Sequence, residues 1–247
     1  MEVIKTLGSV YFGSHRPWYE TDNPFVENFI SRQPCLIKHH DKNNNLLAEY
    51  QLDQYGFRSS ANMSANLWFM GCSDTFGEAL PQEQIFPQLV ADTLGCEYYN
   101  FGTPGTGIEL VARLLFKIRH QLSGKKVVIL LPSLLRYETI IRDLYKCLVP
   151  HNTEYLAHLP ITGNPEKHIQ HKVLFATMLL KSVVEKHDCS FFHFHPYENA
   201  MEEAFRAQLG SRAIPVSLML DRAADGKHYG PLTHQAVAEF MLGHLTK

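Results

Sequence analysis

The chain has 247 residues, of which 45% are hydrophobic and 19% charged, and its formal net charge is −2 at pH 7 with neutral histidines. This length predicts one main domain with an accessory segment. The slightly acidic balance argues against nucleic acid as the main partner, because a surface that follows phosphates usually carries a basic excess.

Cysteine usage and hydropathy narrow the protein class further. The five cysteines have no CxxC spacing, which argues against a disulfide framework or a zinc site and favours a reducing compartment. The N-terminus lacks the apolar core of a signal peptide, and no run approaches the roughly 18 apolar residues of a membrane span. We therefore expect a soluble, cytoplasmic protein with no membrane partner, no metal and no cofactor.

The first 60 residues are polar, rich in aromatic residues and interrupted by prolines. Within them, residues 35–41 and 46–53 (CLIKHHD and LLAEYQLD) flank an Asn-rich turn and predict a β-hairpin. His39 and His40 lie beside this turn, where a solvated hairpin tip is favoured over a metal site.

From residue 61 onward, short apolar runs alternate with helical patterns. The predicted strands are residues 67–71, 96–101, 125–132, 189–195 and 213–218, and the predicted helices are 84–94, 107–122, 166–187 and 232–245. Such repeats predict an α/β fold, a doubly wound, flavodoxin-like parallel sheet of about five strands with helices on both faces. We expect residues 1–60 to be an N-terminal extension packed on a main domain, residues 61–247.

The first predicted strand of the main domain ends in an unusual group of small residues. In FMGCSDTFG, an apolar run stops at Gly71 and is followed by Cys72, Ser73 and Asp74. The stretch is either an ordinary strand-to-helix turn or a nucleophile exposed at the end of a sheet, where ligands of such folds bind. Because neighbouring residues on such a turn point in different directions, only one of Cys72 and Ser73 could face a general base, and the turn alone does not say which.

Two later loops also follow a predicted strand and precede a predicted helix. GTPGTG (residues 102–107) precedes a helix, where it is either a tight turn or a set of free backbone N–H donors. In DGKHYGP, Asp225 lies three residues before His228, so its carboxylate can turn back onto the imidazole and orient it, as in a hydrolytic triad. A solvated charged loop is the alternative.

Taken together, these segments resemble the SGNH (GDSL-like) hydrolase family. GCSDTFG is similar to its GDSxTxG nucleophile block, with Cys72 in place of the usual Asp. NFGTPGTG (residues 100–107) is similar to its second block, and DGKHYGPLTHQAVAEFM (225–241) to its closing DxxHP block and last helix. YGFR (55–58) resembles a segment that often precedes the nucleophile strand. The family's GxND block is absent.

The resemblance implies a role for each matching residue. Ser73 would be the nucleophile, His228 its general base and later the acid, and Asp225 the residue that orients the imidazole. The backbone N–H groups of Ser73 and Gly105 would hold the oxyanion. Ser133 lies closest to the place of the missing asparagine and could donate a hydrogen bond instead.

Three further residues lie near the expected strand ends without an assigned role. Arg136 could place a charge near the site, although a surface salt bridge is favoured. His193 and His195 could line the rim of the pocket, although packing or surface roles are favoured.

The resemblance therefore implies a serine ester hydrolase that forms an acyl-serine intermediate and acts on a small-molecule or carbohydrate ester, as a carbohydrate O-deacetylase or a short-chain acyl-esterase. Two alternatives remain open. One is an acyltransferase with the same triad, and the other is a non-catalytic binding module with an incomplete oxyanion hole.

Overall fold

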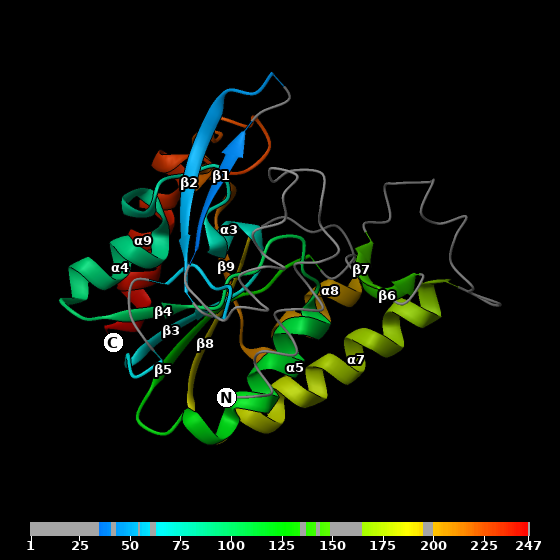
Figure 1. The fold of residues 1–247 in the computed structure, drawn as a ribbon. Helices are drawn as coiled ribbons and strands as arrows, with labels where there is room; N and C mark the ends of the chain where they lie inside the picture. The colour runs from blue at the N-terminus through cyan, green and yellow to red at the C-terminus, as the bar shows by residue number, and fades with distance from the viewer. Residues whose placement is uncertain are drawn as a thin grey trace.

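The computed structural model describes residues 35–40, 43–53, 55–59, 63–133, 137–141, 144–148, 165–194 and 200–246. Its centre is a five-stranded parallel sheet with the strand order β4-β3-β5-β8-β9 (Figure 1). The strands are β3 (Leu67–Met70), β4 (Tyr98–Asn100), β5 (Lys126–Leu130), β8 (Asp188–Phe194) and β9 (Arg212–Ile214). This is the flavodoxin-like order, so the predicted fold class is confirmed.

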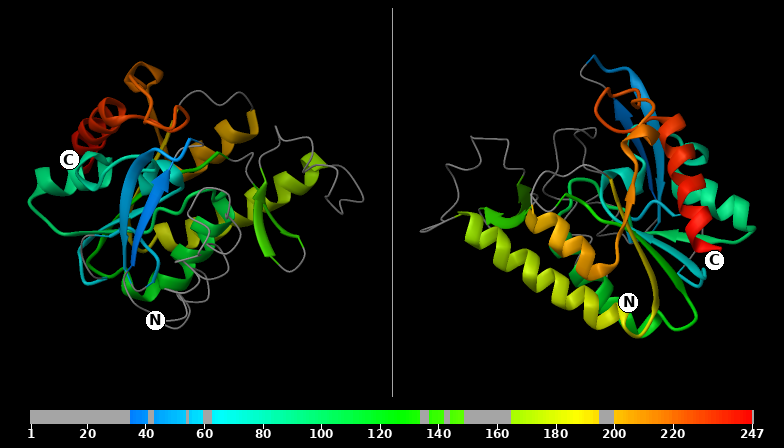
Figure 2. Two further views of the ribbon diagram at one scale, coloured as in Figure 1. Left: turned by 45° about the horizontal axis from the view of Figure 1, so that its top comes forward. Right: turned by 180° about the vertical axis from the view of Figure 1, so that it is seen from behind.

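Helices cover both faces of the sheet, as Figures 1 and 2 show. One face carries α4 (Phe86–Leu94) and α9 (Pro231–Leu245), which pack against each other. The other carries α5 (Ile108–Ile118), α7 (Pro165–Val184) and α8 (Ala200–Leu209), with α7 packed between the other two. None of the helices in the described ranges is long and apolar enough to cross a membrane.

The side-chain alternation of the strands explains this three-layer arrangement. Along β3, Trp68 and Met70 join the core that α5, α7 and α8 complete. Leu67 and Phe69 join the core that α4 and α9 complete. Because successive strand residues point to opposite faces, an uninterrupted apolar run is what a sheet with two covered faces requires.

The N-terminal hairpin is confirmed, with β1 (Cys35–His40) paired antiparallel to β2 (Leu46–Leu52). Its tip is less solvated than the sequence suggested. His39 is 3% exposed and its Nδ1 lies 2.7 Å from the hydroxyl of the buried Tyr50. The Tyr50 ring packs edge-on against Phe76, so the hairpin contacts the main domain. The division of the chain at residue 60 stays a prediction.

Several elements differ from the predicted pattern. The hairpin of β6 (Tyr137–Ile141) and β7 (Leu144–Leu148) and the helix α8 were not predicted. The strand-to-helix turn at Gly71 leads into a helix of a single turn, α3 (Ser73–Phe76). The last strand is shorter than predicted: β9 ends at Ile214, and Val216–Leu218 form the 3₁₀ helix η3. Pro215 explains the early end, because it has no N–H to donate to a strand ladder.

Candidate active site

The turn that follows β3 is tightly closed. A Cβ atom added to Gly71 would lie 2.1 Å from Thr75 Oγ1 and 2.7 Å from the carbonyl oxygen of Leu130, at the end of β5. Only glycine fits this approach. The backbone therefore turns sharply at Gly71, and Ser73 begins α3 at the carboxyl edge of the sheet.

The second predicted block lies directly against this turn. The Asn100 side chain donates from Nδ2 to the carbonyl of Thr75 at 2.9 Å, and the Thr103 N–H donates to the carbonyl of Gly71 at 3.1 Å. A Cβ atom on Gly102 would lie 2.4 Å from the backbone nitrogen of Phe76. The loop that contains Gly105 is thereby held beside the segment that carries Ser73.

The loop before α9 forms a second rigid unit at this edge. The Ala223 N–H donates to the carbonyl of His228 at 2.9 Å, which closes the loop on itself. The carboxylate of Asp221 accepts from the N–H groups of Leu232 and Thr233, in the first turn of α9. Free N–H groups at a helix start need such acceptors, so the contacts tie the loop to the helix.

Asp225 and His228 are joined within this loop. His228 Nδ1 lies 2.5 Å from Asp225 Oδ2, and Oδ1 accepts from the N–H groups of Lys227 and His228. Burial alone would raise the pKa of Asp225, but these hydrogen bonds outweigh it and hold that pKa below its ordinary value. An ionised carboxylate accepts, so Nδ1 carries a proton and Nε2 is the nitrogen left for proton transfer.

Glu78 connects this pair to the Ser73 turn. Its N–H donates to the carbonyl of Ser73 at 3.1 Å, just beyond the end of α3. Its carboxylate Oε2 lies 3.4 Å from His228 Nε2, and the two side chains are 12% and 22% exposed. The sequence analysis did not identify this residue, because the contact depends on the folded positions of two distant loops.

Ser73 and His228 occupy the same edge but are not hydrogen bonded to each other in the described part of the chain. Ser73 is 2% exposed, whereas the sequence suggested small groups exposed at the strand end. The difference follows from the packing of the turn, in which Gly71 and the Gly102 loop leave little room.

The Cys72 side chain has a different environment. Its Sγ lies 3.7 Å from Asp74 Oδ2, and the residue is buried. The described contacts of His228 run to Asp225 and Glu78, not to this thiol.

Arg58 is a further residue whose importance the sequence did not reveal, although it lies in YGFR. Its buried guanidinium donates to the carbonyls of Phe76, Gly77 and Leu80 and to the side chain of Gln82, at 2.7 to 3.1 Å. It also stacks over the Tyr50 ring, 4.8 Å from the centroid. These contacts fix the backbone on both sides of Glu78.

The remaining candidates are less closely tied to this edge. Ser133 is half-buried three residues beyond the end of β5. His193, in β8, is buried, and its Nδ1 lies 2.7 Å from the Oγ of Ser211, the residue just before β9. Arg136 and His195 lie outside the described residues.

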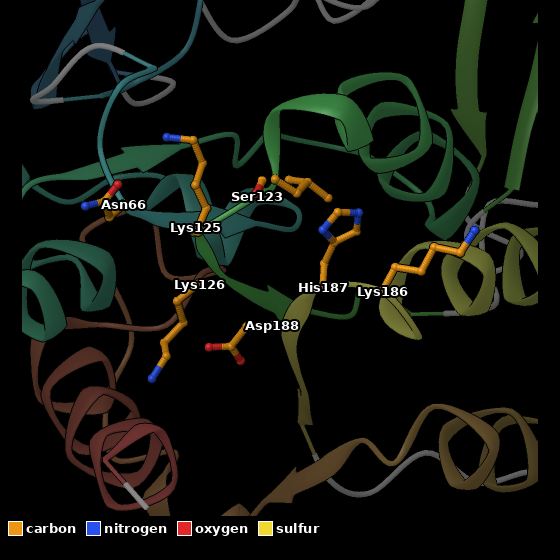
Figure 3. A pocket seen from close by; sticks show the side chains of 9 residues that line it. Asn66, Ser123, Lys125, Lys126, Lys186, His187 and Asp188 are labelled. Atoms are coloured by element: carbon orange, nitrogen blue, oxygen red, sulfur yellow. The ribbon is translucent and has the colours of Figure 1, made fainter.

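A pocket of about 490 Å³ lies at the other end of the sheet (Figure 3). Asn66, Lys126 and Asp188, which line it, stand at the starts of β3, β5 and β8. It therefore opens at the amino ends of the strands, away from Ser73 and His228. Among the described residues, no group of three or more His, Cys, Asp or Glu side chains could hold a metal ion.

Comparison with solved structures agrees with this architecture. A carbohydrate esterase described as displaying divergent catalytic and non-catalytic binding functions matches with a TM-score of 0.51 and 13% identity, covering 87% of each chain. The fold is that of this esterase. The α/β fold that the SGNH resemblance implied is thereby confirmed.

Two further structures are similar at lower scores. One is a member of the lipolytic G-D-S-L family from Veillonella parvula DSM 2008, with a TM-score of 0.46 and 10% identity over 73% of this chain and 98% of that one. The other is a carbohydrate acetylesterase family member from Sinorhizobium meliloti, with a TM-score of 0.44 and 13% identity over 73% and 97%. No protein-family model and no curated protein sequence matches the chain.

Proposed function

We propose that the chain is a serine ester hydrolase of the SGNH type. The observation that carries the proposal is the hydrogen bond of 2.5 Å between His228 Nδ1 and Asp225 Oδ2, on a closed loop at the carboxyl edge of the sheet. This is the edge at which Ser73 begins α3. A carboxylate that fixes the imidazole tautomer is the part of a triad that makes a serine reactive.

In the proposed reaction, His228 Nε2 accepts the hydroxyl proton of Ser73 as Oγ attacks the ester carbonyl. The backbone N–H groups of Ser73 and Gly105 would hold the oxyanion, and Ser133 would supply a third donor. His228 then gives the proton to the departing alcohol, and a water molecule hydrolyses the acyl-serine by the same route in reverse.

For the substrate, we propose a small or carbohydrate ester. The support is the similarity in fold to a carbohydrate esterase, together with the polar environment at this edge, where His228, Asp225 and Glu78 gather. A short acyl group, such as an O-acetyl group on a sugar, is the form we propose to test first.

The test is hydrolysis of a p-nitrophenyl short-chain ester by the wild type, Ser73→Ala and Cys72→Ala. We expect Ser73→Ala to lose about 10³-fold or more in kcat, the usual cost of removing a triad nucleophile, with unchanged thermal unfolding. Cys72→Ala should retain most activity. The assignment is wrong if Ser73→Ala turns over normally while Cys72→Ala is inactive.

A further inference from the structure

The His228 ring lies between two carboxylates. On one side Nδ1 bonds Asp225 Oδ2 at 2.5 Å, and on the other Nε2 lies 3.4 Å from Glu78 Oε2. The second distance suits an ion pair and is long for a hydrogen bond. With Nδ1 protonated, a neutral ring presents a lone pair at Nε2, which a carboxylate oxygen repels. The contact with Glu78 is therefore favourable only when Nε2 also carries a proton.

The charged and titratable groups around the ring are of both signs. From its own loop, the turn after α3, β1 and α9 they are Asp225, Lys227, Glu78, His39 and His234, and the buried Arg58 cation and Asp221 also act on His234. Burial lowers the pKa of both His39 and His234, so these two rings are neutral near pH 7, and Lys227 is exposed. The two carboxylates are the strongest charges in contact with His228.

We propose that Glu78 is a positioning residue that holds His228 by Nε2 in the substrate-free site and releases it before Ser73 can transfer its proton. This inference rests on the function proposed above. On release, the Nε2 proton passes to water, and the lone pair it leaves accepts the hydroxyl proton of Ser73 while Oγ bonds to the ester carbon. Glu78 and Ser73 thus compete for one nitrogen atom.

The surroundings of Glu78 restrict which part of it moves. Arg58 binds the carbonyls of Gly77 and Leu80 on either side, and the Ala79 N–H donates to the Tyr50 hydroxyl at 2.7 Å. These three hydrogen bonds on the neighbouring residues hold the backbone in place, together with the bond from the Glu78 N–H to the Ser73 carbonyl. Release of His228 is therefore a rotation of the Glu78 side chain, with no opening of the loop.

The experiment compares Glu78→Ala and Glu78→Gln with the matched control Glu83→Ala. Glu83 is exposed on the 3₁₀ helix η1 (Gln82–Gln84), close in sequence and with the same charge. Two quantities are measured at pH 6.5 on each folded variant: the rate at which a fluorophosphonate probe labels the protein, and the ¹⁵N resonance of His228 Nε2 in histidine-labelled protein. Glu78→Gln keeps the size of the side chain, so the test survives if Glu78→Ala fails to fold.

We expect Glu78→Ala to be labelled about fivefold faster, the size expected for the loss of one partly exposed ion pair, and Glu78→Gln to gain less. The Nε2 resonance should move in both variants and stay in place in Glu83→Ala. A purely structural role would slow labelling and leave that resonance unchanged, and this result overturns the proposal. If the wild type and all variants remain unlabelled, the proposed function fails, and the Nε2 resonance alone decides whether Glu78 holds the ring.

Discussion

Asp225 and His228 lie on one closed loop and share a hydrogen bond of 2.5 Å, whereas Ser73 lies on a separate turn and has no hydrogen bond to His228 in the described part of the chain. The first half of the proposed site is assembled by local contacts. The second half depends on packing between β3, the Gly102 loop and Arg58. In the proposed site, the His228 ring is therefore oriented by its own loop, and Glu78 lies between this loop and the Ser73 turn.

The largest expected effect comes from weakening the Ser73 turn through Arg58. Arg58→Met removes a buried cation and leaves the carbonyls of Phe76, Gly77 and Leu80 without this donor. Unpaired buried acceptors cost about 1 kcal/mol or more each, so we expect the free energy of unfolding to fall by about 3 kcal/mol. Urea unfolding measures this change.

A control for the Arg58 experiment is available in the same protein. Arg119→Met changes an exposed arginine whose described contacts are the carbonyl and ring of its neighbour Phe116, and it should shift stability by less than about 1 kcal/mol. Equal losses in the two variants would contradict a special role for Arg58 in holding the turn.

The next prediction concerns α9, the helix to which the loop with Asp225 and His228 is tied. His234 is buried, and its Nδ1 accepts from the Phe86 N–H at 3.0 Å. Burial, aided by the nearby Arg58 cation, lowers the pKa of His234 to about 3. Because the unfolded chain binds this proton near pH 6.5 and the folded chain does not, stability falls as the pH drops from about 6.5 towards 3.

Between pH 8 and pH 5, the lowered pKa of His234 should reduce the free energy of unfolding by about 2 kcal/mol. We expect His234→Asn, whose side-chain oxygen can accept the same N–H, to lose that part of the pH dependence. Thermal unfolding of both proteins at pH 5 and pH 8 provides the comparison. An identical pH dependence in the two proteins would show that His234 does not carry it.

The smallest expected effect is the loss of kcat when the proposed third oxyanion donor, Ser133, is removed. If Ser133 donates to the developing oxyanion, Ser133→Ala should lower kcat about 10-fold, or about 1.4 kcal/mol, with little change in KM, because the contact strengthens only as charge develops. Kinetics and thermal unfolding are measured together. Altered stability with unchanged kcat per folded molecule would mean that Ser133 only ends the strand.

The sheet could be predicted well because its signals are local. The apolar run of β3 is continuous because both faces of that strand are buried. The pattern of α5 is amphipathic because the helix packs against the sheet on one side. The helix α8 has a weaker apolar pattern and was missed. The position of Pro215 could have signalled the early end of β9.

In the site, too, contacts between residues close in sequence could be predicted, and contacts between distant segments could not. The Asp225–His228 pair could be predicted because three residues of chain bring a carboxylate back onto an imidazole. The contacts of Glu78 with His228 and of Arg58 with the Ser73 turn join segments far apart in the sequence. A single sequence contains no local pattern for such pairs, so they become visible only in the folded chain.

The central claim is that Ser73 is the nucleophile activated by His228, and its most direct test is to locate the adduct formed with a fluorophosphonate probe. Peptide mass spectrometry is carried out on the labelled wild type, Ser73→Ala and His228→Asn. We predict one adduct on Ser73 in the wild type, none at that site in Ser73→Ala, and strongly reduced labelling in His228→Asn. An adduct on Cys72, or equal labelling of Ser73 with and without His228, would contradict the account.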